Sequence, residues 1–530
     1  MKRYTYKDYL AHVVPCLGYG LLCGSVAGTV IFFFKLAAQK VEGISRKLYG
    51  IMQTSPRYLI IGVLALILLA AVMVWLHKQV PEAKGGGIPR SEGILRGILS
   101  FRWLKTLLGT IAGSMISFFC GLPVGSEGPA VMIGTSLGSM CGNVSKNKAA
   151  WNRYIMSGGA GAGFAVATGA PFAAMLFVLE EVHKRFTPML ILIVSMSVLA
   201  ATYMNQLLCA AFSVSPELFH IGALADFELS HMGYLLVLGF IMAGAVGIFD
   251  GIIEWFDKLT AKGEGVLPKG TKMMVVFLIT GILGMVFAQG VYSGHHVIED
   301  VLEHNMSMVL LCGILVVRLL MMLLITNSGA TGGIFIPTLA IGALVSALAA
   351  KLLMVFGMPE ALFDTVVLLG MCAFIGGTLR APFTAAALFV ELTGQFTNFF
   401  FVALVIFIVH FITEVLNQEA FYEKVVKSMK TAENQDKEAH IEDFEMTISN
   451  GAFVVGKTVR DVMWPASSAI VSVIRAESHY IDMDSDGEKK LYAGDTIVLR
   501  VRYYDEDEVK NYLYGLVGRE QEIRCLNEEE

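Results

Sequence analysis

Glu127 is an acidic residue inside a long apolar region, in the motif Gly-Leu-Pro-Val-Gly-Ser-Glu-Gly-Pro of residues 121–129. A charge at membrane depth costs about 3 kcal/mol on insertion scales, so such a residue usually marks an ion or proton path. The neighbouring glycines let backbone N–H groups turn inward, and a helix that begins at Pro129 directs its positive end to the same point. This arrangement indicates a protein in which a mobile anion competes with a side-chain carboxylate for one position.

Two further Gly-rich segments have the same design, at 84–89 (Lys-Gly-Gly-Gly-Ile-Pro) and at 328–337 (Ser-Gly-Ala-Thr-Gly-Gly-Ile-Phe-Ile-Pro). Each precedes a helical run, so its N–H groups can point at an anion, although a simple tight loop also explains the first segment. An anion held by backbone dipoles instead of a full positive charge is bound moderately, as ion passage requires. We therefore expect both segments and Glu127 to converge on one site.

Four other polar residues in apolar surroundings each have two interpretations. Glu180 and Glu181 either form an interfacial acidic pair against the basic residues that follow, or accept protons at the cytoplasmic mouth. Tyr422, after the last apolar span, is either an aromatic-belt residue or a hydroxyl donor to an anion. Arg318 requires a partner, either in a structural ion pair or in a transport site.

Enzyme signatures are absent from the sequence, which contains no His-Glu-x-x-His, no P-loop and no catalytic-triad spacing. His296, Asp300 and His304 have the spacing of one helix face and could bind a metal, but the spacing alone is weak support. We expect no enzyme activity, no cofactor, no metal and no nucleic-acid partner.

Composition indicates a polytopic membrane protein. Of 530 residues, 55% are hydrophobic and 16% are charged, whereas soluble domains have roughly 25% charged residues. The 54 glycines fit close contacts between helices in a membrane. Apolar spans, several long enough to cross a bilayer, recur near 12–34, 57–77, 103–120, 189–213, 231–253, 273–292, 307–326, 338–357 and 398–416. Shorter, Gly-interrupted segments that are typical of discontinuous helices at a binding site lie around 85–95, 125–142, 157–180, 328–346 and 363–393.

Charge divides the chain into two parts. Residues 431–530 hold 22 acidic and 11 basic residues, whereas residues 1–430 have a net charge of +6. We expect a membrane domain at 1–430, a linker at 431–440, a small domain at 441–520 and an acidic tail at 521–530. Lys2, Arg3 and Lys7 indicate a cytoplasmic start, so a multi-pass protein of the cell membrane with both termini in the cytoplasm is expected.

The membrane part looks duplicated. Residues 169–180 align with 380–391 at an offset of 211, and residues 129–134 align with 337–342 at an offset of 208. Gly- and Ala-rich membrane sequence also aligns easily with itself, but two motifs in one order at nearly one offset favour a repeat. Internal repeats with broken helices are a common plan of transporters. The repeat halves would span about 10–210 and 230–430.

These motifs together resemble the CLC family of chloride channels and chloride/proton exchangers. Residues 85–89 resemble that family's G-S-G-I-P, residues 125–129 its G-[KR]-E-G-P, and residues 333–337 its G-x-F-x-P. Tyr422 stands where the family keeps a late pore tyrosine, and the motifs follow the family's order from about residue 10 to 430. The resemblance implies an all-α polytopic membrane protein, with two inverted repeats of broken and tilted helices, that forms a homodimer with one pore per subunit.

The resemblance also implies roles for individual residues. Glu127 would be the gating glutamate that blocks the outer anion site and carries the proton, and Glu181 would be the inner proton-transfer residue. The anion-binding residues would be Gly86, Gly87, Ser126, Gly128, Ile334, Phe335, Ile336 and Tyr422. Exchangers of the family tend to have an acid at the position of Glu181, and channels do not.

Two residues depart from the family pattern. Gly86 stands where chloride-selective members have Ser, so one hydroxyl donor is missing and the preferred anion is open. Ser126 replaces the usual Lys or Arg beside the gating glutamate, which removes a positive charge near the outer mouth. Neither change removes the expected proton path.

The C-terminal region reads as a small cytoplasmic α/β domain. Residues 444–449, 469–475 and 496–501 alternate as strands do, and helices are expected at 458–463 and 505–516. The Ala-Gly-Asp motif before Thr496 resembles TrkA-C domains, which implies a dimerisation or ligand-sensing module for a small ligand of unknown identity. A packing domain without a ligand is the alternative.

The expected function is secondary active antiport of a small anion, most simply chloride, against protons. A passive chloride channel and a fluoride/proton exchanger of the same family are the alternatives, the second because of Gly86. The Glu-Gly-Pro sequence at 127–129 argues against the fluoride branch.

Overall fold

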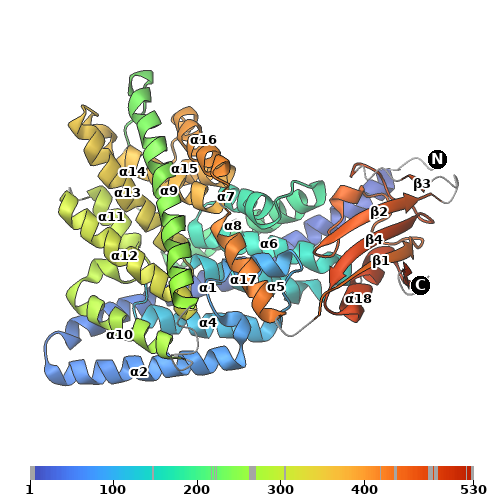
Figure 1. The fold of residues 1–530 in the computed structure, drawn as a ribbon, viewed down its shortest axis with the longest axis horizontal. Coiled ribbons are helices and arrows are strands. Elements are labelled where there is room, and N and C mark those ends of the chain that lie inside the picture. Colours follow the sequence, from blue (N-terminus) through green and yellow to red (C-terminus); the bar gives the residue numbers. More distant parts are fainter. Residues whose placement is uncertain are drawn as a thin grey trace.

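The computed structural model has a large helical body and, at one end of it, a small β-sheet domain (Figure 1). It describes residues 6–145, 148–216, 218–219, 221–222, 224–261, 270–303, 306–417, 419–434, 438–475, 481–482, 487–520 and 522–526. The helices of the body are α1 (Tyr6–Met52), α2 (Pro56–Gln79), α3 (Ile88–Leu95), α4 (Trp103–Phe119), α5 (Glu127–Gly142), α6 (Lys148–Thr168), α7 (Pro171–Phe177), α8 (Pro188–Phe212), α9 (Met232–Ala261), α10 (Thr271–Val286), α11 (His295–Glu303), α12 (Met308–Ser328), α13 (Phe335–Val355), α14 (Phe363–Leu379), α15 (Pro382–Thr393), α16 (Phe399–Val415) and α17 (Phe421–Glu433).

The helices follow from composition and from proline placement. Proline occupies the first or second position of α2, α3, α7, α8 and α15, where its missing N–H costs nothing. Seven helices of the described chain are long and apolar enough to cross a membrane. One face of α2 exposes Ile60, Ile61, Leu64 and Leu68, as a surface in contact with lipid does. The predicted polytopic membrane fold is confirmed.

The two halves of the body meet about a local two-fold axis. Gly125 and Gly333, which are equivalent at the repeat offset of 208, exchange two backbone hydrogen bonds of 2.7 and 2.8 Å in an antiparallel bridge. A residue pairs in this reciprocal way with its own equivalent only when a two-fold axis passes between them. The repeat predicted from the sequence is therefore confirmed.

Reciprocal helix caps show the same symmetry. The Glu180 carboxylate accepts hydrogen bonds from the N–H groups of Phe383 (3.0 Å) and Thr384 (2.7 Å) at the start of α15. The Glu391 carboxylate accepts from the N–H groups at the start of α7, both at 2.8 Å, and all these residues match at the offset of 211. Each acid compensates the positive end of a helix in the other half. Glu180 is thus a helix cap between the repeats, which neither interpretation from the sequence had foreseen.

The C-terminal domain is an antiparallel sheet with one helix. Its strands are β1 (His440–Thr447), β2 (Ser468–Ile474), β3 (Ile481–Asp482), β4 (Thr496–Tyr503) and β5 (Arg524–Cys525), in the order β3-β2-β4-β1-β5, and its helix is α18 (Glu506–Val517). The three strands and the longer helix expected from the sequence are present within a few residues. The short strands β3 and β5 were not predicted, because two residues carry no alternation.

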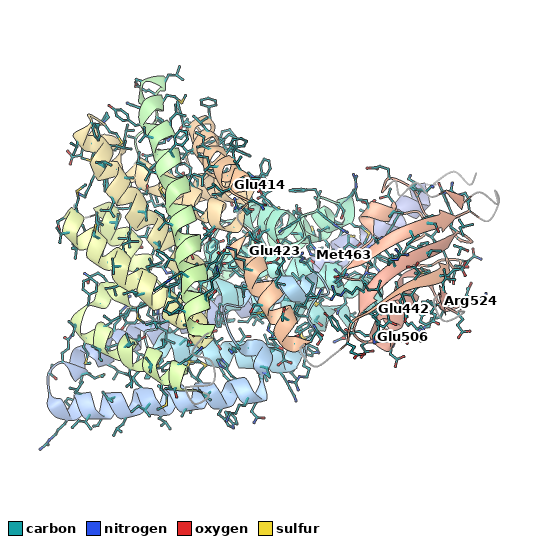
Figure 2. The ribbon with its side chains drawn as sticks, viewed as in Figure 1. Glu414, Glu423, Glu442, Met463, Glu506 and Arg524 are labelled. Atoms are coloured by element: carbon teal, nitrogen blue, oxygen red, sulfur yellow. The ribbon has the colours of Figure 1, made fainter. Side chains whose placement is uncertain are left out.

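The sheet domain is docked on the body through α6. The Arg153 guanidinium donates to the carbonyl of Trp464 (2.9 Å), and the Tyr154 hydroxyl donates to the carbonyl of Asp461 (2.7 Å). The Trp151 and Phe453 rings meet edge to face at 5.3 Å. Figure 2 shows Met463 on the side of the domain that faces the body, where its carbonyl also accepts from Arg153. α17 leads from the body toward this domain (Figure 1).

Candidate functional site

Three Gly-rich helix starts converge at the local two-fold axis, as expected from the sequence. They are the N-termini of α3, α5 and α13. Their backbones touch: a Cβ atom on Gly128 would lie 1.9 Å from the Gly86 carbonyl oxygen and 2.7 Å from Gly333 Cα. A Cβ atom on Gly87 would lie 2.3 Å from the Gly128 carbonyl oxygen. Glycine is required here because no side chain fits between the three chains.

This close approach gives a test of the convergence. We expect Gly128→Ala to lower the free energy of unfolding by about 3 kcal/mol or more, because the added methyl group meets backbone atoms that cannot move away singly. Gly86→Ala is the matched control, because its Cβ would meet no atom closer than 3.7 Å. The thermal unfolding midpoints of both purified variants in detergent are the measurement. Equal loss in both variants would contradict the arrangement.

Glu127 is the first residue of α5 and is completely buried. Its Oε1 accepts a hydrogen bond of 3.1 Å from the Ser126 hydroxyl. Its Oε2 has no hydrogen-bond partner in the described part of the chain. The carboxylate covers Gly125, where a Cβ atom would lie 2.2 Å from Oε2. The acid therefore lies at the bridge between the halves, beside the start of α13.

The first turns of α5 and α13 can bind an anion through their backbone. The initial N–H groups of a helix have no intrahelical acceptor, and the helix dipole makes this end positive. On α13 these groups belong to Phe335 and Ile336, directly after the N-cap residue Ile334. All three residues are buried, so water does not surround these donors as it would at a surface.

Lys35, on α1, is a cation near Glu127 that the sequence analysis did not identify. Its ammonium group donates to the Val166 carbonyl (3.4 Å) and interacts electrostatically with the Glu127 carboxylate. The residue stands more than ninety positions before Glu127, and no local motif connects them. A basic side chain is therefore present near Glu127, although Ser126 itself supplies none.

Tyr422 is buried at the start of α17. Its hydroxyl group interacts electrostatically with both Glu181 and Glu127. It makes no hydrogen bond with any of the described residues. Burial excludes a place in an interfacial aromatic belt, one of the two interpretations of this residue. The position fits a hydroxyl that donates to a ligand.

Glu181 lies in a π-helical turn (Val178–Val182) that directly follows α7. Such turns are rare and often occur at functional sites. The side chain is buried, and neither carboxylate oxygen has a hydrogen-bond partner in the described chain. An unpaired carboxylate in this environment is costly unless it is protonated part of the time. Its neighbour Glu180 differs, because it caps α15.

A second buried acid accompanies Glu181. Glu92, on α3, interacts electrostatically with Glu181, and its Oε2 has no hydrogen-bond partner in the part of the chain that is described. Its Oε1 accepts from Arg96 at 2.8 Å, and Arg96 also lies 3.8 Å from Glu423 on α17. Figure 2 shows Glu423 on that helix. Sequence reasoning missed Glu92, although an acid five residues after Gly87 in a short apolar helix was an available signal.

Aromatic rings separate the two regions. The Phe335 ring at the start of α13 meets the Phe164 ring edge to face at 5.0 Å. Phe164 in turn stacks on Phe177, at the end of α7, at 4.5 Å. These rings extend from the helix start beside Glu127 to the turn that carries Glu181, and they provide an apolar wall there.

Two other candidates do not join the site. Arg318 donates to the carbonyls of Val291 (3.1 Å) and Tyr292 (3.4 Å), so its identified partners are backbone groups. His304 of the possible metal set lies outside the described residues. Within the described ranges no three metal-binding side chains cluster.

Comparisons with known proteins agree with this geometry. Residues 68–414 match the family model described as voltage gated chloride channel, and the chain belongs to this family. The H(+)/Cl(-) exchange transporter ClcA of Salmonella paratyphi B is 31% identical over 389 residues, which cover 70% of this chain and 80% of the relative. The sheet domain begins after the matched family region.

Solved structures show the same fold. A slow cyanobacterial Cl⁻/H⁺ antiporter aligns with a TM-score of 0.71 and 25% identity, and the alignment covers 79% of this chain and 99% of that structure. A CLC-type fluoride/proton antiporter aligns with a TM-score of 0.64 and 20% identity, covering 78% and 98%. At 20% identity, the alignment with the fluoride/proton antiporter shows only that the two proteins share a fold.

Proposed function

We propose that this protein is a chloride/proton antiporter. The observation that carries the proposal is a pair of buried carboxylates, Glu127 and Glu181, that both have oxygens without a hydrogen-bond partner in the described chain. The first lies where anion-binding helix starts converge, and both interact electrostatically with Tyr422. Relatives that carry the names of chloride/proton exchangers support this proposal.

The mechanism follows from competition for one position. When Glu127 is ionised, its carboxylate occupies the place of an anion at the start of α5 and is held there by the helix dipoles. When it is protonated, this attraction is lost and the side chain leaves the position to an anion. Proton and anion therefore use one location alternately and move in opposite directions.

In this proposal the other site residues bind the anion and supply the proton. The N–H groups of Ile334, Phe335 and Ile336 and the Tyr422 hydroxyl bind the anion near the centre. Gly87 and Gly128 allow the backbones to approach one another, and Gly86 contributes its backbone to the site. Ser126 holds the Glu127 carboxylate. Glu181, with Glu92 beside it, receives the proton from the inner side.

The passive channel and the fluoride exchanger are the competing functions. The Glu181 carboxylate, which has no hydrogen-bond partner in the part of the chain that the structure describes, favours proton transfer, because a channel has no need for a buried carboxylate there. The experiment is proton movement driven by a chloride gradient in liposomes that contain the purified protein. We expect protons to move against the chloride flow. Chloride flux without a pH change would make the protein a channel, and fluoride flux without chloride flux would make it a fluoride exchanger.

Gly86 offers a test of anion choice. A Cβ at this position has free space, with the nearest atom 3.7 Å away, and its φ is not positive, so serine fits without strain. We expect Gly86→Ser to increase the preference for chloride over nitrate about tenfold, because a hydrogen bond to an anion contributes ~1.5 kcal/mol or more. Competition of nitrate with chloride transport in liposomes measures it. Gly86→Ala is the control for the added volume, and an equal effect of alanine would remove the role of the hydroxyl.

The proposal also includes the domain boundaries, the location of the termini and the oligomeric state. We place the transport domain at 1–430 and the regulatory domain at 441–520, with a TrkA-C-like fold. The first part of α1 and the sheet domain lie at one end of the molecule, since the Tyr19 ring packs on Trp151, which meets the Phe453 ring of the sheet domain. With basic residues at the N-terminus, this supports a cytoplasmic location of both termini in the cell membrane. A homodimer follows from the family resemblance.

A further inference from the structure

Glu423 is a partly buried acid of α17, outside the anion and proton positions proposed above. It follows Tyr422 directly, and its side chain is 22% exposed. Its Oε2 accepts a hydrogen bond from the Lys184 ammonium group, and its Oε1 lies 3.8 Å from the Arg96 guanidinium group. These three residues form an ion network that joins α17 to α3 and to the segment after the π-helical turn.

The backbone at Lys184 has an uncommon conformation. Its φ is 51°, in the left-handed region that is unfavourable for a residue with a Cβ atom. The chain turns here between the π-helical turn (Val178–Val182) and α8. A conformation of this kind persists where the surrounding contacts determine it. The ion pair with Glu423 is such a contact, and it keeps the Lys184 ammonium group close to the turn that carries Glu181.

The two cations that Glu423 binds also lie beside the buried acids Glu92 and Glu181, here called the acid pair. Arg96 donates to Glu92 Oε1 at 2.8 Å. Lys184 interacts electrostatically with both members of the acid pair, and Glu423 does so with the opposite sign. A cation favours the ionised form of a neighbouring carboxyl group, whereas an anion favours the protonated form. Glu423 therefore compensates two charges that would otherwise keep the acid pair ionised.

Other titratable groups near the acid pair and Glu423 are engaged with partners of their own. They are Glu180 with the start of α15, His183 with the Ser157 hydroxyl at 2.7 Å, and Lys427 with Glu419. Tyr422 faces Glu181 with a neutral hydroxyl group. In the described ranges Glu423 is the acid that contacts both Arg96 and Lys184, so the counter-charge of these cations depends on it.

Glu423 itself is a fixed negative charge. Burial alone would raise the pKa of the Glu423 carboxyl group, but the hydrogen bond from Lys184 and the nearby positive charges lower it. Glu423 is therefore ionised at neutral pH and does not receive the transported proton. It acts on the groups that do.

We propose that Glu423 is a positioning residue of the inner proton pathway, which holds Arg96 and Lys184 through its negative charge and thereby lets the acid pair take up a proton. The consequence for transport rests on the proposed function. The consequence for protonation of the acid pair does not.

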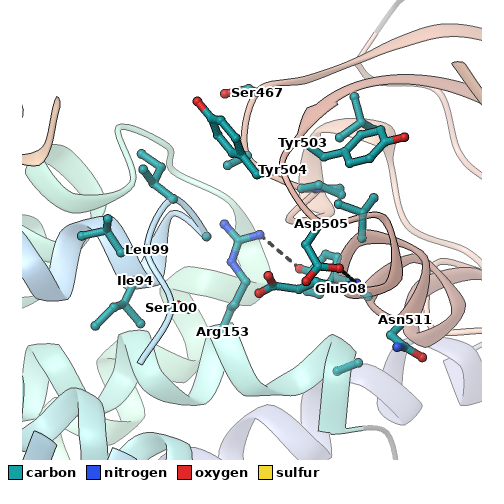
Figure 3. A pocket seen from close by; sticks show the side chains of 18 of the residues that line it. Ile94, Leu99, Ser100, Arg153, Ser467, Tyr503, Tyr504, Asp505, Glu508 and Asn511 are labelled. Carbon is teal, nitrogen blue, oxygen red and sulfur yellow. Dashed lines mark hydrogen bonds between the residues drawn. The ribbon is translucent and has the colours of Figure 1, made fainter. Parts of the chain in front are cut away.

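The ion network is separate from the cavity between the helical body and the sheet domain. Figure 3 shows this cavity, with Ile94, Leu99 and Arg153 among the residues that line it. Neither Arg96 nor Glu423 belongs to its lining. Substitution of Glu423 therefore tests the acid pair without changing the walls of that cavity.

The first test is the protonation of the acid pair in the purified protein, without any ion gradient. The infrared carbonyl band of protonated carboxyl groups is recorded against pH, and the part that Glu181→Gln lacks reports the acid pair. We expect Glu423→Gln to move the titration of this part about one pH unit toward acid, because a negative charge is removed. Glu423→Asp keeps the charge and should restore the original titration.

Three variants separate charge from structure. Glu254→Gln is the matched control, because it removes another ion pair of α17, with Lys424 at 2.7 Å, and should leave the titration unchanged. Lys184→Gln alone should move the titration toward alkaline pH, and this shift decides if Glu423→Gln does not fold. Lys184→Gln combined with Glu423→Gln should return the titration toward that of the unchanged protein. No shift in Glu423→Gln, an equal shift in Glu254→Gln, or no reversal in the double variant overturns the proposal.

The second test is proton movement driven by chloride in liposomes, over a series of pH values that are equal on both faces. We expect half-maximal proton movement of Glu423→Gln at a pH about one unit lower, with chloride flux retained. If the unchanged protein moves chloride without protons, the proposed function fails and the infrared result still decides the role of Glu423. If the unchanged protein exchanges the two ions and Glu423→Gln keeps its pH profile, the proposed function stands and this inference is wrong.

Discussion

Glu127→Gln is expected to leave anion transport intact while proton-coupled transport falls about 100-fold, which corresponds to ~2.7 kcal/mol on the barrier. Glutamine has nearly the shape of the protonated acid but cannot ionise, so it never competes with an anion and never carries a proton. The Glu127 side chain is buried beside Gly125, and one of its oxygens has no hydrogen-bond partner among the described residues, so an amide of the same size fits there. Chloride efflux and internal pH, recorded in the same liposomes, measure the two fluxes.

Glu391→Gln is the matched control for this variant. Glu391 is also an acid of the helical body, but it caps α7 from the other repeat half and has no place in the proposed path. The amide oxygen of glutamine still accepts a hydrogen bond, so coupling should be preserved. If Glu127→Gln still moved protons against chloride, the assignment of the gating carboxylate would be wrong.

Glu181→Gln is expected to have the second-largest effect, namely loss of proton movement of about 100-fold with chloride flux retained. The reason is that both carboxylate oxygens are buried without hydrogen-bond partners in the described chain, and Glu92 lies near. Removing the Glu181 carboxyl blocks delivery of protons from the inner side to Glu127. The anion site at α13 is untouched.

The adjacent residue provides the control. Glu180 stands in the same π-helical turn, yet its carboxylate binds three donors of α15: the N–H groups of Phe383 and Thr384 and the Thr384 hydroxyl. Glu180→Gln should lower stability slightly and leave the ratio of protons to chloride unchanged. Equal uncoupling in both variants would show that the turn's conformation, and not the Glu181 proton, determines coupling.

Much of the fold was predictable because it depends on local patterns. Apolar length gives the membrane helices, proline gives their starts, and the motif pairs at 211 and 208 give the repeat. Gly125 and Gly333, which stand four residues before the aligned segments and share their offset of 208, are bonded to each other. Alternation was enough to place β1, β2 and β4.

The remaining features depend on contacts between distant segments. Lys35 lies near Glu127 only because α1 packs across α6, and Glu92 meets Glu181 only because α3 turns toward the end of α7. The sequence alone does not distinguish Glu180 from its neighbour Glu181. The position of α15 makes Glu180 a helix cap, whereas Glu181 has no hydrogen-bond partner among the described residues. The cavity between the body and the sheet domain requires two parts of the chain to be docked, which no local pattern records.

The most direct measurement of the central claim is the reversal potential of the reconstituted protein under crossed chloride and pH gradients. Antiport through Glu127 requires this potential to shift when the pH gradient alone is changed, and Glu127→Gln should abolish that shift. A reversal potential that stays at the chloride equilibrium value at every pH gradient would contradict proton exchange and show a passive anion pathway.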